Sequence, residues 1–433
     1  MRSNLFWTVD FIRGKKVTEH YNQIKLIMEA KDSSKANQLI DNNLENLLKY
    51  AVTHTDFYSS HQNFKSLEDF PIINKNIIRA DYNKFISKKY SSETLFKVTT
   101  SGSTGTPFKA YQDAIKRARH IADNIYFNEK AELDLGERLY YFRVWNKINK
   151  KDRLKKFMQN IIECDAGTFT KDAIGKLLNQ MKNDNSKKSM LAYSSTYEAL
   201  VTKIKEYELS TEGISMSSII TMSETLPDQT KVNLGKMFNC PVISRYSNME
   251  NGFLAQQCIS ENNEYHLNTA SFKIELLKFD ENSRVANGEM GRIVVTDLFN
   301  YGMPIIRYDT GDIAIMEDNG KCDWQGTIFS KVLGRKVDFI YSTNDEIISP
   351  HVITNTMWKY PDINQFQFIQ KSQFNFILKL NSSVLEPMIE KDIEINFKSY
   401  LGENANINFE YVEEIPVLNS GKRKKIVNEY KVP

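Results

Sequence analysis

The sequence predicts an α/β fold in which a large N-terminal α/β domain is followed by a small α+β domain. Strand-like apolar runs at residues 218–222, 241–244 and 292–296 alternate with helical stretches. The C-terminal part of the chain then changes to a strand–strand–helix–strand pattern. We therefore assign residues 1–335 to the N-terminal domain and residues 336–433 to the C-terminal domain.

The N-terminal elements are predicted from residue spacing. Ile, Leu and Met residues recur at helical spacings over residues 20–53, and Asn74 is positioned to cap a short helix. Residues 95–99 have the pattern of a strand, which leads into a loop at 100–107 that is rich in Ser, Gly and Thr. An amphipathic helix is predicted at 115–126, where apolar residues recur every three or four positions.

The later elements of the chain have a different pattern. Residues 272–277 alternate between apolar and polar side chains, which is typical of an antiparallel strand. Residues 366–370 and 374–380 are predicted to pair as two strands. A single apolar face over 385–397 indicates a helix, and residues 407–412 add a further strand.

The composition excludes several classes of protein. The 433 residues include 57 Lys and Arg against 54 Asp and Glu, and the resulting net charge of +3 is too balanced for a dedicated nucleic-acid binder. No apolar run reaches the roughly 18 residues that a membrane-spanning helix needs, so we expect a cytoplasmic protein without membrane insertion. Four cysteines in so long a chain are too few for a disulfide framework and indicate a reducing compartment.

The most informative stretch is residues 99–107, which contain two glycines and six hydroxyl side chains. Glycine lets the backbone approach a ligand closely and turn its N–H groups toward an anion, and hydroxyls add further donors. The loop therefore suits a polyphosphate, although it lacks the Gly-Lys-Ser/Thr of a Walker loop. Taken alone, the same composition also fits an ordinary surface turn.

Four further motifs follow this loop in order. They are Tyr-Ser-Asn-Met-Glu at 246–250, Arg-Tyr-Asp-Thr-Gly-Asp at 307–312, Gly-Arg-Lys-Val-Asp at 334–338 and Asn-Ser-Gly-Lys at 419–422. Together the five motifs, over nearly the whole chain, resemble the adenylate-forming superfamily of acyl-CoA synthetases, adenylation domains and luciferases. The segment 67–75, which contains Phe-Pro-Ile-Ile-Asn-Lys, resembles the phenylacetate–CoA ligase branch. It is closest to the capsular-polysaccharide-biosynthesis (CapK-like) and deazaflavin-cofactor-adenylylating relatives within that branch.

The resemblance implies ATP-dependent activation of a carboxylic acid, in which the carboxylate joins the α-phosphate of ATP and pyrophosphate is expelled. Glu250 matches the family's carboxylate that holds Mg²⁺. Lys422 matches a catalytic lysine on a mobile C-terminal domain, which meets the α-phosphate and the substrate carboxylate as negative charge accumulates there. The residues that match the family's phosphate loop are Ser101, Gly102, Ser103, Thr104, Gly105 and Thr106.

The resemblance also assigns the nucleoside contacts. Tyr246, followed by Ser247, matches the aromatic residue that stacks on adenine. Asp312 matches the carboxylate that accepts both ribose hydroxyls, and Arg335 matches a further ribose or phosphate contact. The residues that match a loop beside the adenine pocket are Ser223 and Glu224.

The sequence departs from the family pattern in two places. The hinge carboxylate of the family usually stands two residues after the arginine, where this chain has Val337 followed by Asp338. This difference leaves the rotation of the C-terminal domain between half-reactions in question. Tyr246-Ser247 replaces the more usual Tyr-Gly, which leaves the shape of the acyl pocket open.

Each of these residues also has a simpler interpretation when it is taken alone. A lone carboxylate is usually a solvated surface charge, and Tyr246 could serve core packing. The basic runs at 147–156 and 422–425 are typical of solvated faces. The ordered set of motifs favours the catalytic interpretation, and a non-catalytic nucleotide-binding protein of the same fold is the alternative.

Cys258, His266 and Cys322 resemble part of a zinc site that some relatives in this branch carry. A closed structural zinc site needs four ligands, and Trp324 stands at the fourth position, where it cannot bind the metal. We therefore expect a vestigial site that does not hold zinc.

The expected reaction uses ATP and Mg²⁺ to form an acyl-adenylate from a small-molecule carboxylate. The acyl group then passes to CoA or to an amine, hydroxyl or sugar acceptor, and the branch suggests surface-polysaccharide biosynthesis as the role. The sequence does not name the acid, leaves formation of a homodimer open and gives no reason to expect a nucleic-acid partner.

Overall fold

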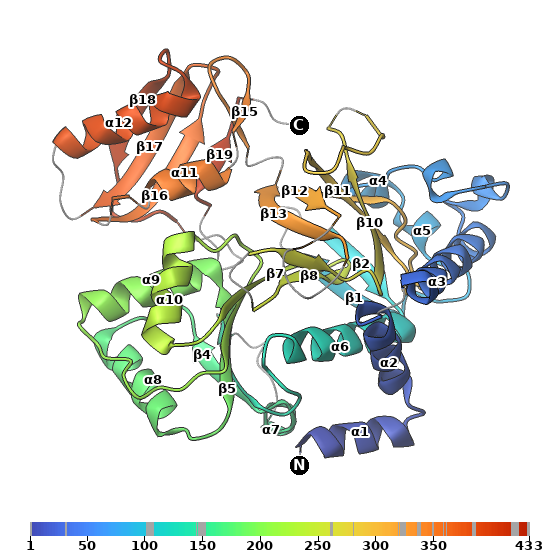
Figure 1. Cartoon of the computed structure of the whole chain (residues 1–433). Helices are drawn as coiled ribbons and strands as arrows, with labels where there is room; N and C mark the ends of the chain where they lie inside the picture. The colour runs from blue at the N-terminus through green and yellow to red at the C-terminus, as the bar shows by residue number, and fades with distance from the viewer. Residues whose placement is uncertain are drawn as a thin grey trace.

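The structure of the chain is a computed structural model (Figure 1). It describes residues 2–30, 33–100, 108–143, 145, 153–259, 263–279, 281–318, 320, 326–335, 339–348, 350–357, 359–360, 362–382, 387–416 and 424–430. Among these residues, no helix is long and apolar enough to cross a membrane.

Eleven strands of the large domain form one mixed sheet in the order β10-β11-β12-β13-β9-β8-β7-β6-β5-β3-β4. One half of the sheet is parallel and contains β3 (Arg138–Arg143), β4 (Ile161–Asp165), β5 (Lys188–Tyr193), β6 (Ser218–Met222) and β7 (Val242–Asn248). The predicted strands at 218–222 and 241–244 are β6 and the first part of β7.

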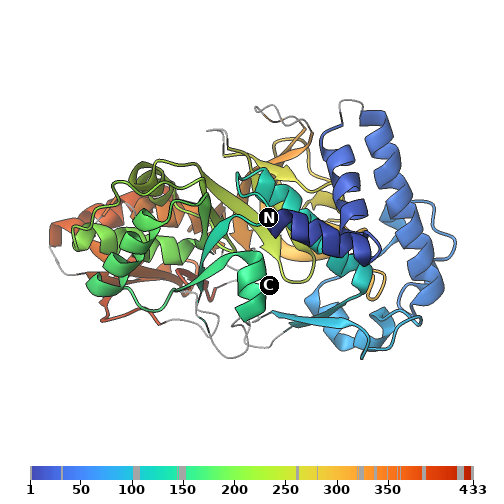
Figure 2. The same ribbon diagram turned by 90° about the horizontal axis from the view of Figure 1, so that it is seen from below.

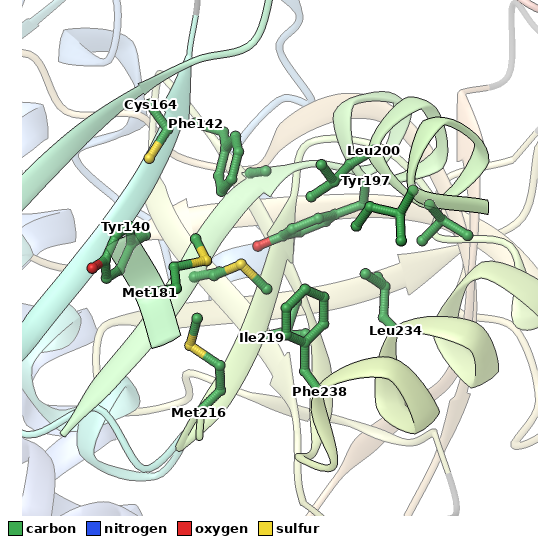
Figure 3. Close-up of a cluster of buried hydrophobic side chains, with 14 of the residues drawn as sticks. Tyr140, Phe142, Cys164, Met181, Tyr197, Leu200, Met216, Ile219, Leu234 and Phe238 are labelled. Carbon is green, nitrogen blue, oxygen red and sulfur yellow. The ribbon is translucent and has the colours of Figure 1, made fainter. Parts of the chain in front are cut away.

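Helices cover one face of the parallel half and pack on the apolar side chains that its strands place there. The helices are α8 (Lys171–Asn183), α9 (Ser194–Glu206) and α10 (Asp228–Phe238), and the short α7 (Arg153–Gln159) lies next to β4. Figure 3 shows how Tyr197 from α9 and Phe238 from α10 pack with Tyr140 of β3 in the core beneath these helices.

The other half of the sheet is antiparallel. It contains β8 (Gly252–Gln257), β9 (Tyr265–Leu267), β13 (Ile328–Arg335), β12 (Tyr308–Glu317), β11 (Met290–Asp297) and β10 (Phe272–Leu277). The predicted antiparallel strand at 272–277 is confirmed as β10, and the predicted strand at 292–296 lies within β11. β7 is parallel to β6 and antiparallel to β8, so it joins the two halves.

The N-terminal helices pack around the antiparallel half. They are α1 (Arg2–Ile12), α2 (Lys16–Met28), α3 (Ser33–His54), α4 (Lys75–Ala80), α5 (Tyr82–Phe85) and α6 (Ala114–Glu129), with short 3₁₀ turns η1 (Ser59–His61) and η2 (Leu67–Asp69). The predicted amphipathic helix at 115–126 is confirmed as α6, which packs on Phe253 of β8.

The helical segment predicted at 20–53 is two helices, because Glu29 leaves helical geometry with φ −111° and ends α2. α2 and α3 lie side by side, far from the small domain (Figure 2). Apolar spacing alone did not predict the division, because both helices bury apolar residues such as Ile24 and Leu47.

A separate hairpin carries the predicted phosphate loop. β1 (Phe96–Thr100) and β2 (Phe108–Gln112) are antiparallel, and their ladder ends on the pair Thr100 and Phe108. The strand predicted at 95–99 is therefore confirmed as β1, one residue later. The residues that join the two strands, 101–107, lie outside the described part of the chain.

The small domain has a four-stranded sheet in the order β18-β17-β16-β19, formed by β16 (Ile363–Gln370), β17 (Asn375–Ser382), β18 (Asn406–Tyr411) and β19 (Ile426–Asn428). Beside it lie α11 (Pro350–Met357), α12 (Pro387–Leu401) and the short pair β14 (Ile340–Tyr341) and β15 (Ile347–Ile348). The predicted strand pair, helix and further strand are confirmed as β16–β17, α12 and β18. The predicted boundary at residue 336 lies outside the described residues.

Candidate active site

The first part of the site is Glu250, in the tight turn between β7 and β8. The backbone N–H of Asn251 donates to Asn248 Oδ1 at 2.7 Å and fixes this turn. The Glu250 side chain is only 2% exposed. Its Oε1 atom accepts a hydrogen bond from Tyr308 Oη at 3.0 Å and lies 2.7 Å from Lys75 Nζ. Glu250 is therefore a buried carboxylate with a compensating cation, and not a solvated surface charge.

The second part is Asp312 in β12, which faces Tyr246 of β7. Tyr246 Oη donates to Asp312 Oδ2 at 2.7 Å. Thr310 supports the pair, because its Oγ1 accepts the Asp312 backbone N–H at 3.1 Å. Gly311 between them has φ +78°, a conformation that glycine adopts without a steric cost. The glycine thus allows β12 to bend where Asp312 enters the site.

Arg335, at the end of β13, stands directly opposite Asp312 in the ladder between β12 and β13. Its Nε atom lies 3.9 Å from Asp312 Oδ1, and its side chain is 44% exposed. Burial raises the pKa of Asp312, and the Arg335 charge opposes that rise. The Arg335 side chain is therefore accessible to a ligand that contacts Asp312.

The two tyrosines of the site act as fixed donors. Burial, with the nearby Asp312 carboxylate, holds the pKa of Tyr246 well above its ordinary value. Burial and Glu250 have the same effect on the pKa of Tyr308. Both phenols therefore keep their protons at neutral pH and donate to the carboxylates they touch.

A strained residue sets the position of Tyr308. The preceding residue, Arg307, has φ 51°, which is uncommon for a bulky side chain. Its guanidinium holds the buried Glu275 through contacts of 3.2 and 2.9 Å and donates to the Phe70 carbonyl at 3.2 Å. These contacts fix the backbone at the start of β12, and such strain is often found at functional sites.

The segment before α4 reaches the site through the backbone. The Ile73 N–H donates to the Arg307 carbonyl at 3.0 Å, and the Asp309 N–H donates to the Ile73 carbonyl at 2.8 Å. The predicted Asn74 cap is confirmed, because its side chain accepts the N–H groups of Asn76 and Ile77. Lys75 follows this cap and is thereby placed against Glu250. The sequence motifs did not assign Lys75 or Tyr308 to the site.

Other predicted residues lie further from the two carboxylates or have structural contacts. Ser247 pairs with Phe253 in the ladder between β7 and β8. Glu224 Oε2 accepts the backbone N–H of Ser195 at 3.0 Å and so caps the start of α9. Ser223, just before it, has φ 68°. The role of Ser223 and Glu224 beside adenine remains a prediction.

Several predicted residues lie outside the described part of the chain. The structure therefore gives no position for the phosphate loop, for Lys422, or for the hinge positions Val337 and Asp338. Lys425, three residues after Lys422, is described and forms an ion pair with Glu198 of α9.

The predicted zinc residues are partly described. His266 in β9 is buried, which lowers the pKa of its imidazole to about 4 and keeps it neutral. Cys258 directly follows β8, the neighbour of β9, whereas Cys322 and Trp324 lie outside the described residues. Within the described ranges, no group of three or more His, Cys, Asp or Glu side chains is arranged to hold a metal. The zinc prediction remains untested.

Comparison with known proteins finds a relative that is similar over nearly the whole chain. Residues 340–429 match the family model of the CapK C-terminal domain. Protein CapK of Staphylococcus aureus is 25% identical over 451 residues, which cover 97% of this chain and 95% of CapK.

Solved structures share the fold. A 2-hydroxyisobutyryl-CoA ligase in complex with 2-HIB-AMP has a TM-score of 0.73 and 16% identity, over 92% of this chain and 90% of the ligase. An anthranilate CoA ligase in complex with anthranoyl-AMP has a TM-score of 0.55 and 13% identity, over 78% of this chain and 67% of that one. The chain therefore has the fold of the adenylate-forming acyl-CoA ligases.

Proposed function

We propose that this chain, a CapK homologue with the adenylate-forming ligase fold, activates a carboxylic acid with ATP as an acyl-adenylate and then transfers the acyl group. The observation that carries the proposal is the pair of carboxylates, Glu250 and Asp312, held by two tyrosines from two strands of one sheet. The hairpin of β1 and β2, whose strands flank the glycine- and hydroxyl-rich loop in the sequence, is the third feature that supports the proposal. Two such carboxylates suit a nucleotide, because one can take a metal ion and the other can take sugar hydroxyls.

Asp312 is suited to bind the ribose. A carboxylate has two oxygens that each accept hydrogen bonds, so it can take two neighbouring hydroxyls at once. Oδ2 of Asp312 accepts the Tyr246 hydroxyl, and Arg335 lies near Oδ1. The aromatic ring of Tyr246 would then lie next to the adenine, as the family resemblance implies.

Glu250 is suited to hold Mg²⁺, because the ion prefers oxygen ligands and the carboxylate is fixed by its neighbours. Magnesium bound there would offset the negative charge of the phosphates. The phosphate loop at Ser101–Thr106 would contact the outer phosphates, and Lys422 would neutralise charge where the substrate carboxylate meets the α-phosphate.

We propose two classes of acceptor for the acyl group. We include CoA, because solved proteins of this fold are CoA ligases. We include an amine, hydroxyl or sugar acceptor in surface-polysaccharide biosynthesis, because the sequence resembles that part of the phenylacetate–CoA ligase branch.

The test is carboxylate-dependent release of pyrophosphate from Mg·ATP over a panel of acids, measured with and without CoA. We expect release with at least one acid, and a further thioester product if CoA is the acceptor. A chain that binds ATP but releases no pyrophosphate with any acid would contradict the proposal and favour the non-catalytic alternative. Glu250→Gln is the matched inactive variant, because it keeps the side-chain shape and removes the charge.

A further inference from the structure

Lys75 contacts the carboxylate that we propose as the magnesium ligand. Its Nζ atom lies 2.7 Å from Glu250 Oε1. The two partners differ in burial, because the Lys75 side chain is 30% exposed and the Glu250 side chain only 2%. A buried carboxylate without a compensating charge is costly, so Lys75 stabilises Glu250 in the ligand-free chain.

Lys75 also lies at the base of the predicted phosphate loop. Its ammonium stands 5.7 Å from the ring centroid of Phe108, the first described residue after that loop. Phe108 pairs with Thr100, the last described residue before the loop. One partly exposed cation therefore contacts the Glu250 carboxylate and lies near Phe108, at one end of the loop.

We propose that Lys75 binds the outer phosphates of the nucleotide, and that it exchanges Glu250 for phosphate oxygens when Mg·ATP binds. The Lys75 ammonium would be repelled from a carboxylate that also holds a divalent cation. The phosphates of a nucleotide bound beside Glu250 would then be the anions that offset the Lys75 charge. This inference rests on the proposed ATP binding and adds a residue that recognises the triphosphate and pyrophosphate end.

The experiment is calorimetric titration of the full chain with ATP, pyrophosphate and AMP in the presence of Mg²⁺. For Lys75→Gln we expect the affinities for ATP and pyrophosphate to fall roughly 10- to 100-fold, the usual value of a charge-assisted contact, while AMP affinity changes less than about twofold. Lys75→Arg should restore most of the loss. Equal losses for ATP and AMP, or no loss, would overturn the role of Lys75 in phosphate binding.

Two further variants separate binding from folding. Lys84→Gln is the matched control, because Lys84 is an exposed lysine nearby that pairs with Asp81. It should leave all three affinities unchanged. The double variant Glu250→Gln with Lys75→Gln removes both charges of the pair. It therefore contains no buried, unpaired carboxylate at position 250 that could destabilise the fold. The ratio of ATP to AMP affinity should still be lower in this double variant than in Glu250→Gln alone.

Failure of the two proposals can be distinguished. A wild-type chain that binds neither ATP nor AMP would overturn the proposed function, and the Lys75 role with it. A wild-type chain that binds both, with an ATP to AMP ratio that Lys75→Gln does not change, would overturn the Lys75 role alone.

Discussion

Lys425 and Glu198 form an ion pair that joins the small domain to α9 of the large domain. Both side chains are partly buried, with 26% and 16% of their surfaces exposed. Glu198 also accepts a hydrogen bond from Ser194 Oγ at 3.2 Å, so its carboxylate is held in place. Lys425 is the last residue of the basic run 422–425, which the sequence alone left open to interpretation as a solvated face.

Breaking this pair should slow the first half-reaction. We expect Lys425→Glu to reduce the rate of pyrophosphate release roughly two- to tenfold, because a partly buried pair contributes about 1 kcal/mol to the arrangement of the two domains that the structure has. The charge-swapped double variant, Lys425→Glu with Glu198→Lys, should recover most of the rate of pyrophosphate release. A double variant as slow as the single one would contradict a pairwise role.

Lys422→Ala should abolish adenylation while leaving ATP binding nearly intact. A contact made mainly in the transition state lowers the rate more than it lowers ground-state affinity, and we expect a loss of at least about 100-fold. Pyrophosphate release and calorimetry with ATP measure the two quantities.

The control for Lys422 must come from outside the basic run, because Lys425 has its own partner in the large domain. Lys379→Ala is suitable, since Lys379 pairs with Glu410 at 3.2 Å within the small domain. If Lys422→Ala and Lys379→Ala lose the same small fraction of the rate, the catalytic assignment of Lys422 is wrong.

Asp312→Ala should weaken ATP binding roughly 10- to 100-fold without unfolding the chain, because it removes both acceptors proposed for the ribose. Calorimetry gives the affinity, and thermal unfolding checks the fold. Asp318→Ala, at an exposed position beyond the end of β12, is the control. Unchanged ATP affinity in Asp312→Ala would refute the ribose assignment.

Stability should fall as the pH drops from about 6.5 to about 4, and His20 should contribute to this loss. Burial, with the nearby Arg119 charge, lowers the pKa of His20 to about 4. The unfolded chain therefore binds a proton in this interval that the folded chain does not, so acid favours unfolding.

The size of the His20 contribution can be measured as a slope. In His20→Phe, the free energy of unfolding should depend on pH less steeply, by about 1 kcal/mol per pH unit. The substitution keeps an aromatic ring against Phe299, whose ring centroid lies 5.4 Å from that of His20. Equal slopes from denaturant titrations of the two proteins between pH 6 and 5 would contradict the assignment.

Purified protein should contain little zinc, because Trp324 stands where a fourth ligand is expected. Elemental analysis is the measurement. A stoichiometric amount of zinc would contradict this prediction and would identify Cys258, His266 and Cys322 as structural ligands.

Local sequence patterns predicted much of the secondary structure. The Asn74 cap, α6 and the β16–β17 pair depend on residues that are near one another in the sequence, and all three are confirmed. The division between α2 and α3 was missed, because apolar spacing continues through both helices.

Long-range contacts could not be predicted in the same way. Lys75 and Glu250 are far apart in the sequence, and the pairing of Ile73 with Tyr308 at the start of β12 helps to bring them together. Glu224 has a carboxylate that fits the family motif, but its contact with the start of α9 depends on how a loop packs on a helix. A motif identifies a residue type, but it does not identify the group that the folded chain places in contact with that residue.

β19 has a consequence for how the chain can be engineered. It is an edge strand of three residues, paired only with β16 in the four-stranded sheet, and Ile426 within it is buried opposite Phe368. The described strands on either side of Lys422 in the sequence, β18 and β19, are therefore both paired within this sheet. Deleting residues 426–430 would remove β19 and leave the edge of β16 without its paired strand. Affinity tags and fusion partners are better placed at the N-terminus than immediately after this strand.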